Sequence, residues 1–465
     1  MGGFGTGINA LDISGTAFGL GQGLNVQSIV QSLTQAAQAG ETEYVNEQTL
    51  YNSQISALSN ISNLLTSLQT ATQTLQDPAG PLAARNANSS NSGVVTATAS
   101  SGITPANYSI IVNSLASTST FSSQSLASGT ATFGTGAITL QVGSNLPVTI
   151  NVDGTNNTLN GLASVLNSGH YGVTASVIND ASGATLALTS STGGQAGEIT
   201  ITSNTTGLRL SQAVAGQNAS LSVNGVNVQT STNTVSGVIP GVTFNLLGTS
   251  ASPVTISVTQ DVNQATTAIN NFVSAYNSVA QAINTQFTYT AGASSQPSLF
   301  SDSSLQQVQA TLANDVNYFI SGNSGISGLS SVGVNLQQDG TLTVDPATLT
   351  SALTSNAAAV QTLFQGPDYV SGFAGQLYKD INSLNDPTHG VIALDLQGIN
   401  QEEQDVTQTI NDFNANLQQQ QQQWTTEYSQ VNATLQELPL LIAQANGQAA
   451  LTSSSSSSST GGTIA

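Results

Sequence analysis

Apolar side chains recur every seven residues near both ends of this chain, and this pattern limits its possible folds more than any other feature. In the first stretch, the repeated positions hold Tyr44, Tyr51, Leu58, Ile61, Leu65, Leu68 and Leu75. Such a heptad pattern places an apolar seam along one side of a helix, which then packs against a partner helix. Asp77 and Pro78 follow as stop signals. The spacing therefore predicts a stem helix within residues 41–80.

The partner seams lie in the last part of the chain, which we expect to form helical stem over residues 261–435. Asp261 and Gln264 have the spacing of a capping box, and the seam that follows holds Ala265, Ile269, Phe272, Tyr276, Val279 and Ile283. A later helix carries a second seam and includes the glutamine tract Gln418–Gln423. We predict that stem packing depends on Leu58, Leu65, Leu68, Ile269, Phe272, Tyr276, Ile410, Phe413, Leu417 and Trp424.

Between the helical regions, residues 81–260 change to short runs of β-branched and Thr residues. Val254–Val258 is one such run, and Asn224-Gly225 is a typical turn between strands. These runs predict an antiparallel β-rich head, with a short helix near residues 158–167 and an outer subdomain, about 127–215, inserted in an inner one. Within the stem, residues 332–344 predict a β-hairpin, and Asp345-Pro346 begins a helix that runs to Phe364.

The two helical regions are far apart in sequence and carry matching apolar seams, which they can bury only against each other. We therefore predict an α+β multidomain protein. Its coiled-coil-like stem is formed by the N- and C-terminal regions, and the antiparallel β-rich head domains are inserted between them.

Both ends of the chain carry short apolar stripes. The residues are Leu24, Ile29, Val30 and Leu33 near the N-terminus, and Leu435, Leu438, Leu441 and Ile442 near the C-terminus. Short helices with little local packing are marginal in water, and Pro439 weakens the second one. We expect residues 1–40 and 436–465 to be mobile leg segments that order on contact with assembly partners.

Composition excludes several classes of function. The chain has 3 Lys+Arg against 23 Asp+Glu, a net charge of −20, and only 6% of its residues are charged. Nucleic-acid binding and attraction to an anionic membrane both need clustered basic side chains, so we expect neither. The absence of cysteine excludes disulfides and thiolate metal sites. We also expect no membrane span, since no run of about 18 apolar residues occurs, and no cleavable signal peptide.

Few residues offer catalytic chemistry. His170 and His389 each stand in a turn-like setting without a second His or Cys nearby. The glycines from Gly19 to Gly23 lack the preceding strand and the following Lys of a phosphate-binding loop. Asp339-Gly340 fits a hairpin turn better than a calcium loop. We predict a non-enzymatic protein without catalytic, cofactor-binding or metal-binding residues and without a cofactor; a carboxylate pair that converges only in three dimensions stays open.

Several segments, taken in order, resemble one family. Residues 18–33 form a glycine-punctuated start followed by an amphipathic helix, and residues 54–58 lie in the next helix. Residues 159–190 look like the β motif shared by flagellin and hook-associated proteins. Residues 333–342 and 357–364 are similar to the C-terminal region of flagellar filament cap proteins, the flagellar hook-associated protein 2 family, which the whole arrangement resembles. The chain departs from the family by carrying Gln, Asn, Ser and Thr where stem helices generally carry Lys, Arg and Glu. An acidic external medium is one hypothesis for this departure.

The resemblance implies a function in assembly. Members of this family cap the distal end of the bacterial flagellar filament as a ring-shaped homo-oligomer, commonly a pentamer, and promote flagellin folding and polymerisation while preventing monomer loss. It also implies export by the flagellar type III route without a cleaved signal and an extracellular location at the tip. Flagellin is the implied partner, with a hook–filament junction protein and an export chaperone as further candidates. Surface adhesion by the head is a secondary role in the family.

Two alternatives stay open. Another flagellar axial protein, either a flagellin or a hook–filament junction protein, would share helical ends and a β-rich middle. A secreted adhesin or surface-layer protein would share the polar, acidic and cysteine-free composition, but it predicts a secretion signal.

Overall fold

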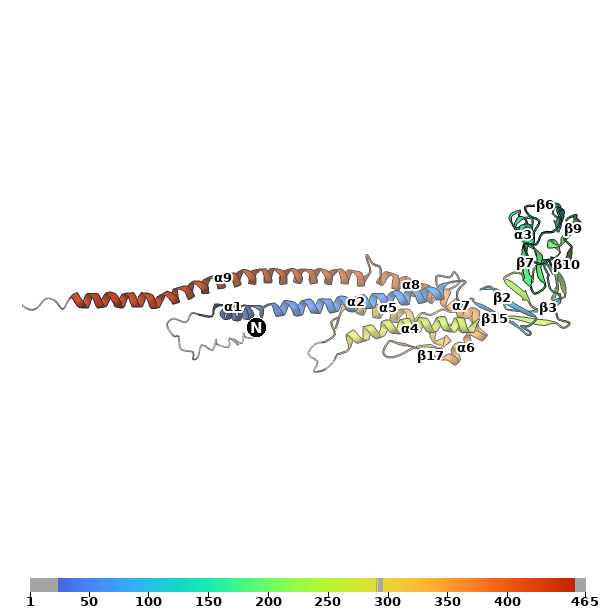
Figure 1. Ribbon diagram of the computed structural model, residues 1–465. Helices are drawn as coiled ribbons and strands as arrows, with labels where there is room; N and C mark the ends of the chain where they lie inside the picture. Colours follow the sequence, from blue (N-terminus) through green and yellow to red (C-terminus); the bar gives the residue numbers. More distant parts are fainter. Residues whose placement is uncertain (1–23, 290, 292–295, 456–465) are drawn as a thin grey trace, which may run out of the picture. The chain divides into compact units, whose positions relative to one another are not determined.

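The computed structural model of the chain describes residues 24–289, 291 and 296–455. The chain forms two compact units, each described here by itself. The first unit takes its described residues from the ranges 1–63, 285–305 and 385–465, and the second comprises residues 64–284 and 306–384. Figure 1 shows the helices and strands along the chain. The structure is an α+β protein with helical N- and C-terminal regions and antiparallel sheets between them, as the sequence predicts.

The first unit is helical. Its elements are α1 (Val26–Gln38), the first part of α2 (Glu41–Gln76) and α9 (Val391–Ser455). α1 packs against α9 (Figure 1). The contacts between α2 and α9 include polar side chains: Gln48 Nε2 donates to Glu403 Oε1 at 3.1 Å and to Thr407 Oγ1 at 2.6 Å. Asn414 Nδ2 donates to Glu41 Oε1 at 2.7 Å. Amides here make the interhelical contacts for which other coiled coils use ion pairs.

The second unit contains most of the remaining helices. They are most of α4 (Val262–Phe287) and of α5 (Ser303–Val316), α6 (Pro346–Ser355), α7 (Ala357–Gln365), α8 (Phe373–Leu384) and the 3-10 turn η2 (Leu329–Val332). The hairpin joins β16 (Val334–Leu336) to β17 (Leu342–Val344). Every seam residue predicted on α4 is buried. Asp345 caps α6, because its Oδ1 accepts from the N–H of Ala347 at 3.0 Å.

The β-rich part of the second unit has four further sheets, all antiparallel. One has the order β1-β15-β3-β11-β12, and its strands are Arg85–Ser89, Val254–Gln260, Ala106–Ser114, Ala219–Val223 and Val226–Thr230. The second has the order β13-β14-β2, and its strands are Thr234–Ile239, Val242–Leu246 and Val95–Ala99. The third has the order β10-β4-β8-β7, and its strands are Leu210–Val214, Thr120–Ser123, Gly183–Ser190 and Val173–Asp180. The fourth has the order β6-β5-β9, and its strands are Val148–Val152, Gly136–Val142 and Ile199–Asn204.

These sheets enclose two separate hydrophobic cores. The first and second sheets contribute to one core, which includes Ile110, Leu221 and Phe244. The third and fourth sheets share the other with α3 (Leu159–Ser168), and it includes Leu140 and Leu162. The 3-10 turn η1 (Gln195–Gly197) leads into β9. Strand β4 (Thr120–Ser123) pairs with β8 in the third sheet, and an outer subdomain over about 127–215 stays a prediction.

Three local details differ from the sequence prediction. The helix expected to run from Asp345 to Phe364 is two helices, because the chain leaves helical geometry at Asn356. Helix α8 was not predicted, although its buried residues Phe373, Leu377 and Ile381 have helical spacing. The capping box at Asp261 is half formed: its Oδ1 accepts from the N–H of Gln264 at 3.1 Å, but its own N–H donates to the carbonyl of Ala84.

Asparagine side chains act as short strand partners at several places. Asn277 on α4 donates from Nδ2 to the carbonyl of Leu342 at 2.8 Å and accepts from the N–H of Leu342 at 2.6 Å. Asn167 on α3 pairs in the same way with Ala175 of β7, at 2.8 Å for both bonds. Each amide satisfies one N–H and one C=O at the edge of a sheet, as a neighbouring strand would.

Replacing Asn277 with leucine should lower the free energy of unfolding by about 1–3 kcal/mol, because the partly buried N–H and C=O of Leu342 lose both partners. Urea unfolding followed by circular dichroism measures the change. The matched control is Asn270→Leu on the exposed side of the same helix, which we expect to change stability by less than about 0.5 kcal/mol. Equal effects of the two substitutions on the free energy of unfolding would show that the pairing of Asn277 with Leu342 does not stabilise the fold.

Candidate functional site

The N-terminal stripe lies on and just before α1. Asn25 caps the helix by accepting at Oδ1 from the N–H of Ser28 at 3.2 Å. The N–H of Leu24 donates to Oδ1 of Asn432 on α9 at 2.7 Å. Val30 is buried, and Ile29 and Leu33 are half-buried. The structure therefore brings the N-terminal stripe onto α9 in the first unit.

The C-terminal stripe lies on α9 and is largely exposed. The exposed fractions are 39% for Leu435, 57% for Leu441 and 44% for Ile442, whereas Leu438 is half-buried. One turn earlier, Val431 is 47% exposed. Helix α9 continues through Pro439 to Ser455. The result is an exposed apolar surface at the end of a long helix, which is typical of a protein–protein contact. We call it the α9 stripe.

The predicted stem residues fall into two groups. Those on α2 and α4 are fully buried: Leu58, Leu65, Leu68, Ile269, Phe272 and Tyr276. On α9, Leu417 is buried, whereas Ile410, Phe413 and Trp424 are half-buried. The ring of Phe413 lies against the turn at Gly40, where an added Cβ would meet it at 3.6 Å. The α9 residues thus pack along one side of their helix and leave part of each side chain exposed.

The residues considered for catalysis occupy surface positions. His170 is exposed, and its Nδ1 lies 2.9 Å from the carbonyl oxygen of Ser168. His389 is also exposed and lies 3.6 Å from Asp386. Asp339 closes the hairpin turn by accepting from the N–H of Thr341 at 3.0 Å. The glycines of residues 19–23 lie outside the described part of the chain.

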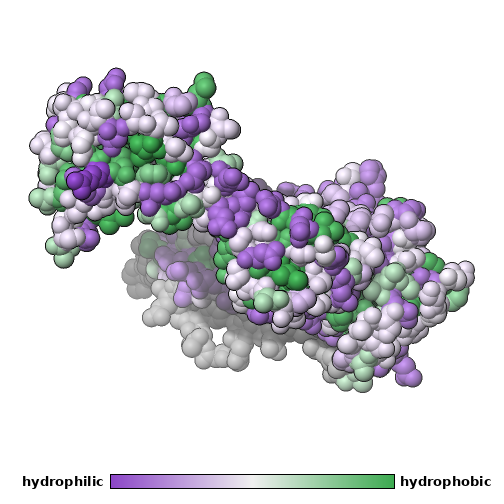
Figure 2. Space-filling view, turned by 90° about the vertical axis from the view of Figure 1, so that its right-hand side faces the viewer, coloured by the Kyte–Doolittle hydropathy of each residue, from purple (hydrophilic) through white to green (hydrophobic). Residues whose placement is uncertain are grey.

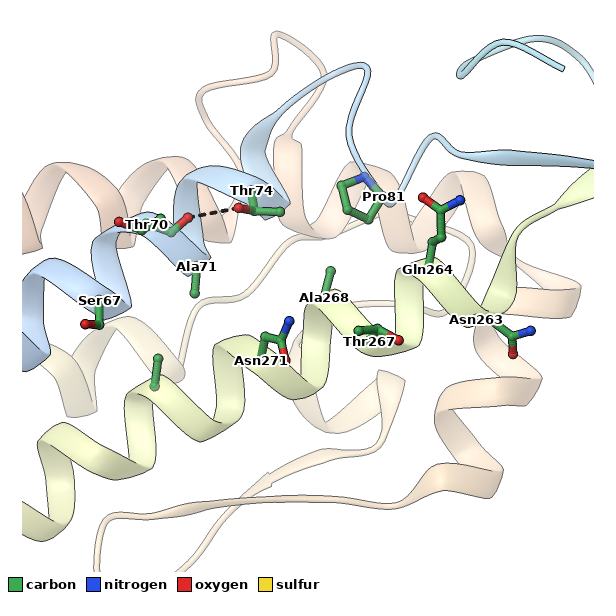
Figure 3. Close-up of a pocket in the computed structure, with 11 residues that line it drawn as sticks. Ser67, Thr70, Ala71, Thr74, Pro81, Asn263, Gln264, Thr267, Ala268 and Asn271 are labelled. Atoms are coloured by element: carbon green, nitrogen blue, oxygen red, sulfur yellow. Dashed lines mark hydrogen bonds between the residues drawn. The ribbon is translucent and has the colours of Figure 1, made fainter. Parts of the chain in front are cut away.

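A groove of about 600 Å³ lies between α2 and α4 in the second unit (Figure 3). Its described lining consists of small or amide side chains: Ser67, Thr70, Ala71, Thr74, Pro81, Asn263, Gln264, Thr267, Ala268, Asn271 and Ala275. Thr74 Oγ1 donates to the carbonyl of Thr70 at 3.0 Å, so this hydroxyl is engaged within its own helix. No described lining residue titrates near neutral pH, and acid–base catalysis therefore has no group to use in this groove.

Electrostatic contacts are few. In the described part of the chain, the pair His389–Asp386 is the one contact within ion-pair distance. Figure 2 shows one face of the molecule, on which pale, weakly polar residues are mixed with hydrophilic ones and with separate hydrophobic patches.

Across the described residues, no group of three or more His, Cys, Asp or Glu side chains is placed to hold a metal ion. None of the described helices has the length and hydrophobicity needed to cross a membrane.

One set of titratable residues was not singled out from the sequence. Asp315 on α5 and Asp380 on α8 face each other in the second unit, and Asp395 on α9 faces Asp302 in the first. Their positions in sequence contain no signal for these pairs, because the partners are far apart along the chain and meet only through packing. None of these groups lines the groove between α2 and α4.

The comparisons with known proteins agree with this arrangement. The profile of the flagellar hook-associated protein 2 N-terminus matches residues 22–119, and that of the C-terminus matches residues 216–439. The segment between them contains the outer β subdomain. The flagellar hook-associated protein 2 of Escherichia coli strain K12 is 29% identical over 452 residues, covering 91% of this chain and 95% of that protein. The B-type protein of Pseudomonas aeruginosa is 27% identical, covering 83% of this chain and 86% of that protein.

A solved structure gives the same result for the fold. The crystal structure of the D1-D2-D3 domains of the flagellar cap protein from Escherichia coli matches with a TM-score of 0.60 and 27% identity. The match covers 74% of this chain and 99% of that one. Both terminal profiles, nearly full-length relatives and a shared fold lead to one assignment: the chain belongs to the flagellar hook-associated protein 2 family.

Proposed function

We propose that this protein caps the distal end of a bacterial flagellar filament, promotes flagellin folding and polymerisation there, and prevents the loss of flagellin monomers. The observation that carries the proposal is the ordered match of both terminal regions to one family. A solved relative of the same fold is named a flagellar cap protein. The function needs no catalytic residue, and we propose that the chain is not an enzyme.

The terminal helices supply the contact with the filament in this proposal. The α9 stripe is apolar and exposed, and α1 lies beside the part of α9 that precedes it. Burying the exposed side chains of the α9 stripe, Leu435, Leu441 and Ile442, contributes at most about 5–9 kcal/mol before ordering entropy is subtracted. That contribution suits a cap that stays attached and still shifts as each flagellin subunit enters. Mobility of residues 1–40 and 436–465 in the free subunit stays a prediction.

The remaining parts of the proposal concern location and partners. We propose a ring-shaped homo-oligomer at the filament tip, outside the cell, exported by the flagellar type III route. Flagellin is the main partner, and a hook–filament junction protein and an export chaperone are further candidates. Family membership favours the cap over a flagellin, a junction protein, or a secreted adhesin or surface-layer protein. Surface adhesion by the β-rich head stays a prediction.

Deleting the gene tests the proposal. We expect short or absent filaments and flagellin released into the medium, because subunits leave the tip before they fold and insert. Restoring the gene should restore filament length, and immunogold labelling should place the protein at the tip. Label spread along the filament shaft, or filaments of normal length in the deletion strain, would contradict the proposed role.

A further inference from the structure

Two buried side-chain atoms lack a hydrogen-bond partner in the described part of the chain, and both are aspartate oxygens. They are Oδ2 of Asp315 and Oδ2 of Asp395. A buried acceptor without a donor costs about 1–3 kcal/mol, and more when it is charged. Each of these carboxyl groups also faces a second carboxyl group from another element. The same unfavourable arrangement therefore occurs twice, once in each compact unit.

Asp315 is the more buried of the two. It lies on α5 with 7% of its surface exposed, and the titratable groups that face it are Asp380 on α8 and the phenol of Tyr276 on α4. Asp380 accepts from Nε2 of Gln376 at 3.1 Å. The one basic residue nearby in sequence, Lys379, is exposed. The chain's other basic residues, Arg85 and Arg209, lie in the β-rich part, and Arg85 donates to backbone carbonyls there.

Asp395 repeats this arrangement on α9. It faces Asp302, whose Oδ1 caps α5 by accepting from the N–H of Leu305 at 2.8 Å, and it also interacts with Ser304. Glu402, two turns further along α9, adds a third negative charge. On α2, Tyr51 faces Glu402, and its hydroxyl donates to Oε1 of Glu47 at 3.1 Å. None of the interactions that shift the pKa of Asp395 comes from a cation.

We propose that each carboxyl pair, Asp315–Asp380 and Asp395–Asp302, shares one proton in the folded protein, so that proton uptake stabilises the helical units and the fold is most stable in mildly acidic solution. The protonated carboxyl group donates its O–H to an oxygen of the ionised one. That hydrogen bond supplies the missing donor and removes one of two like charges.

The titration of these groups has the matching direction. Burial, followed by the charge of Asp380, raises the pKa of Asp315 to about 7. Burial and the charge of Asp302 raise the pKa of Asp395, and a hydrogen bond from Ser304 offsets part of this shift. An aspartate in the unfolded chain has a pKa of about 3.9. Between that value and about 7, Asp315 therefore binds more protons in the folded state than in the unfolded state. The free energy of unfolding therefore falls as the pH rises through this window, and the penalty is complete above about pH 7.

Exposed aspartates set the acidic limit of this stability. Hydrogen bonds from Ser371 and from nearby backbone N–H groups lower the pKa of Asp368 to about 2. A hydrogen bond from Thr341 likewise lowers the pKa of Asp339, and one from Thr348 lowers the pKa of Asp345. These groups stabilise the fold only while they are ionised, so their contribution is lost as the pH falls below about 4. Maximum stability consequently lies near pH 4, where the two windows meet.

The test compares thermal unfolding of the full-length protein and of Asp315→Asn at about pH 5.5 and about pH 8. The wild-type melting temperature should be several degrees lower at the higher pH. In Asp315→Asn the amide donates to Asp380 at every pH, so we expect a higher melting temperature at about pH 8 and a smaller difference between the two conditions. Asp380→Asn should act in the same direction, which keeps the test valid if one variant folds poorly. Asp405→Asn, at an exposed position of α9, is the matched control and should leave the difference unchanged.

A second measurement detects the proton itself. In protein labelled with ¹³C at aspartate carboxyl groups, one signal should titrate near neutral pH and disappear in Asp315→Asn. The proposal is wrong if all aspartate signals titrate in the acidic range, or if Asp315→Asn leaves the pH dependence of melting unchanged. Stabilisation by magnesium or calcium ions at about pH 8, lost in Asp315→Asn, would also overturn it, because the pair would then bind a cation instead of a proton.

Discussion

Replacing Phe373 with alanine should lower the free energy of unfolding of the second unit by about 3–5 kcal/mol. Phe373 is fully buried on α8. Its ring lies 5.5 Å from that of Phe272, 5.8 Å from that of Phe364 and 6.3 Å from that of Tyr318, measured between centroids. The three contacts are edge-on, the arrangement in which aromatic pairs add about 0.5–1.5 kcal/mol beyond burial. One substitution therefore removes a ring shared by α4, α7 and α8 and leaves a cavity.

Urea unfolding and calorimetry measure this effect, and Phe319→Ala is the matched control. Phe319 is 70% exposed in the same unit, so its truncation should change stability by less than about 0.5 kcal/mol. Phe272→Ala and Leu68→Ala should approach the effect of Phe373→Ala, since both side chains are fully buried. Similar stability of Phe373→Ala and Phe319→Ala would show that the aromatic cluster does not hold the unit together.

Removing residues 1–40 and 436–465 should abolish filament capping and leave a folded protein. The deletion takes away α1 and most of the α9 stripe, but it leaves both β cores and the α4 seam in place. In a strain that carries only the truncated gene, we expect filaments as short as those of the deletion strain. The measurements are filament length by electron microscopy, flagellin in the medium, and circular dichroism of the purified fragment.

Point substitutions separate the stripe from the helix that carries it. Leu435→Ser with Ile442→Ser removes exposed apolar surface and should shorten filaments without lowering the melting temperature. Gln436→Ser with Gln444→Ser, at exposed positions of the same helix, should leave filament length unchanged. Full-length filaments with the truncated protein, or equal effects of the two double substitutions, would rule out the assembly role of the α9 stripe.

Much of the fold follows from local pattern. The heptad spacing of Leu58, Leu65 and Leu68 predicts the helix that the structure contains at Glu41–Gln76. The glutamine tract Gln418–Gln423 is helical within α9 because its apolar neighbours keep the helical spacing. Prediction was weaker where neighbouring elements decide the outcome. Asn356 separates α6 from α7, and α8 is recognisable mainly by side chains that pack against other helices.

The candidate site divides in the same way. The terminal stripes can be read from the spacing of Leu24, Val30, Leu435 and Ile442, but their exposure cannot, because it depends on which helix lies beside each one. The acidic external medium stays a hypothesis. The proposed proton sharing by the carboxyl pairs adds a reason for it that composition did not provide, because it would make the fold more stable in such a medium.

The sequence by itself determined the order of helical and β-rich regions, the family, and the scarcity of ion pairs, because periodicity, motif order and charge are properties of the chain. Only the tertiary structure decided that Asp315 meets Asp380, that Asn277 pairs with the backbone of Leu342, and that three phenylalanines converge around α8. These contacts join residues that are distant in sequence. Their energies depend on burial and on the distance between side chains, which packing establishes and which no local pattern contains.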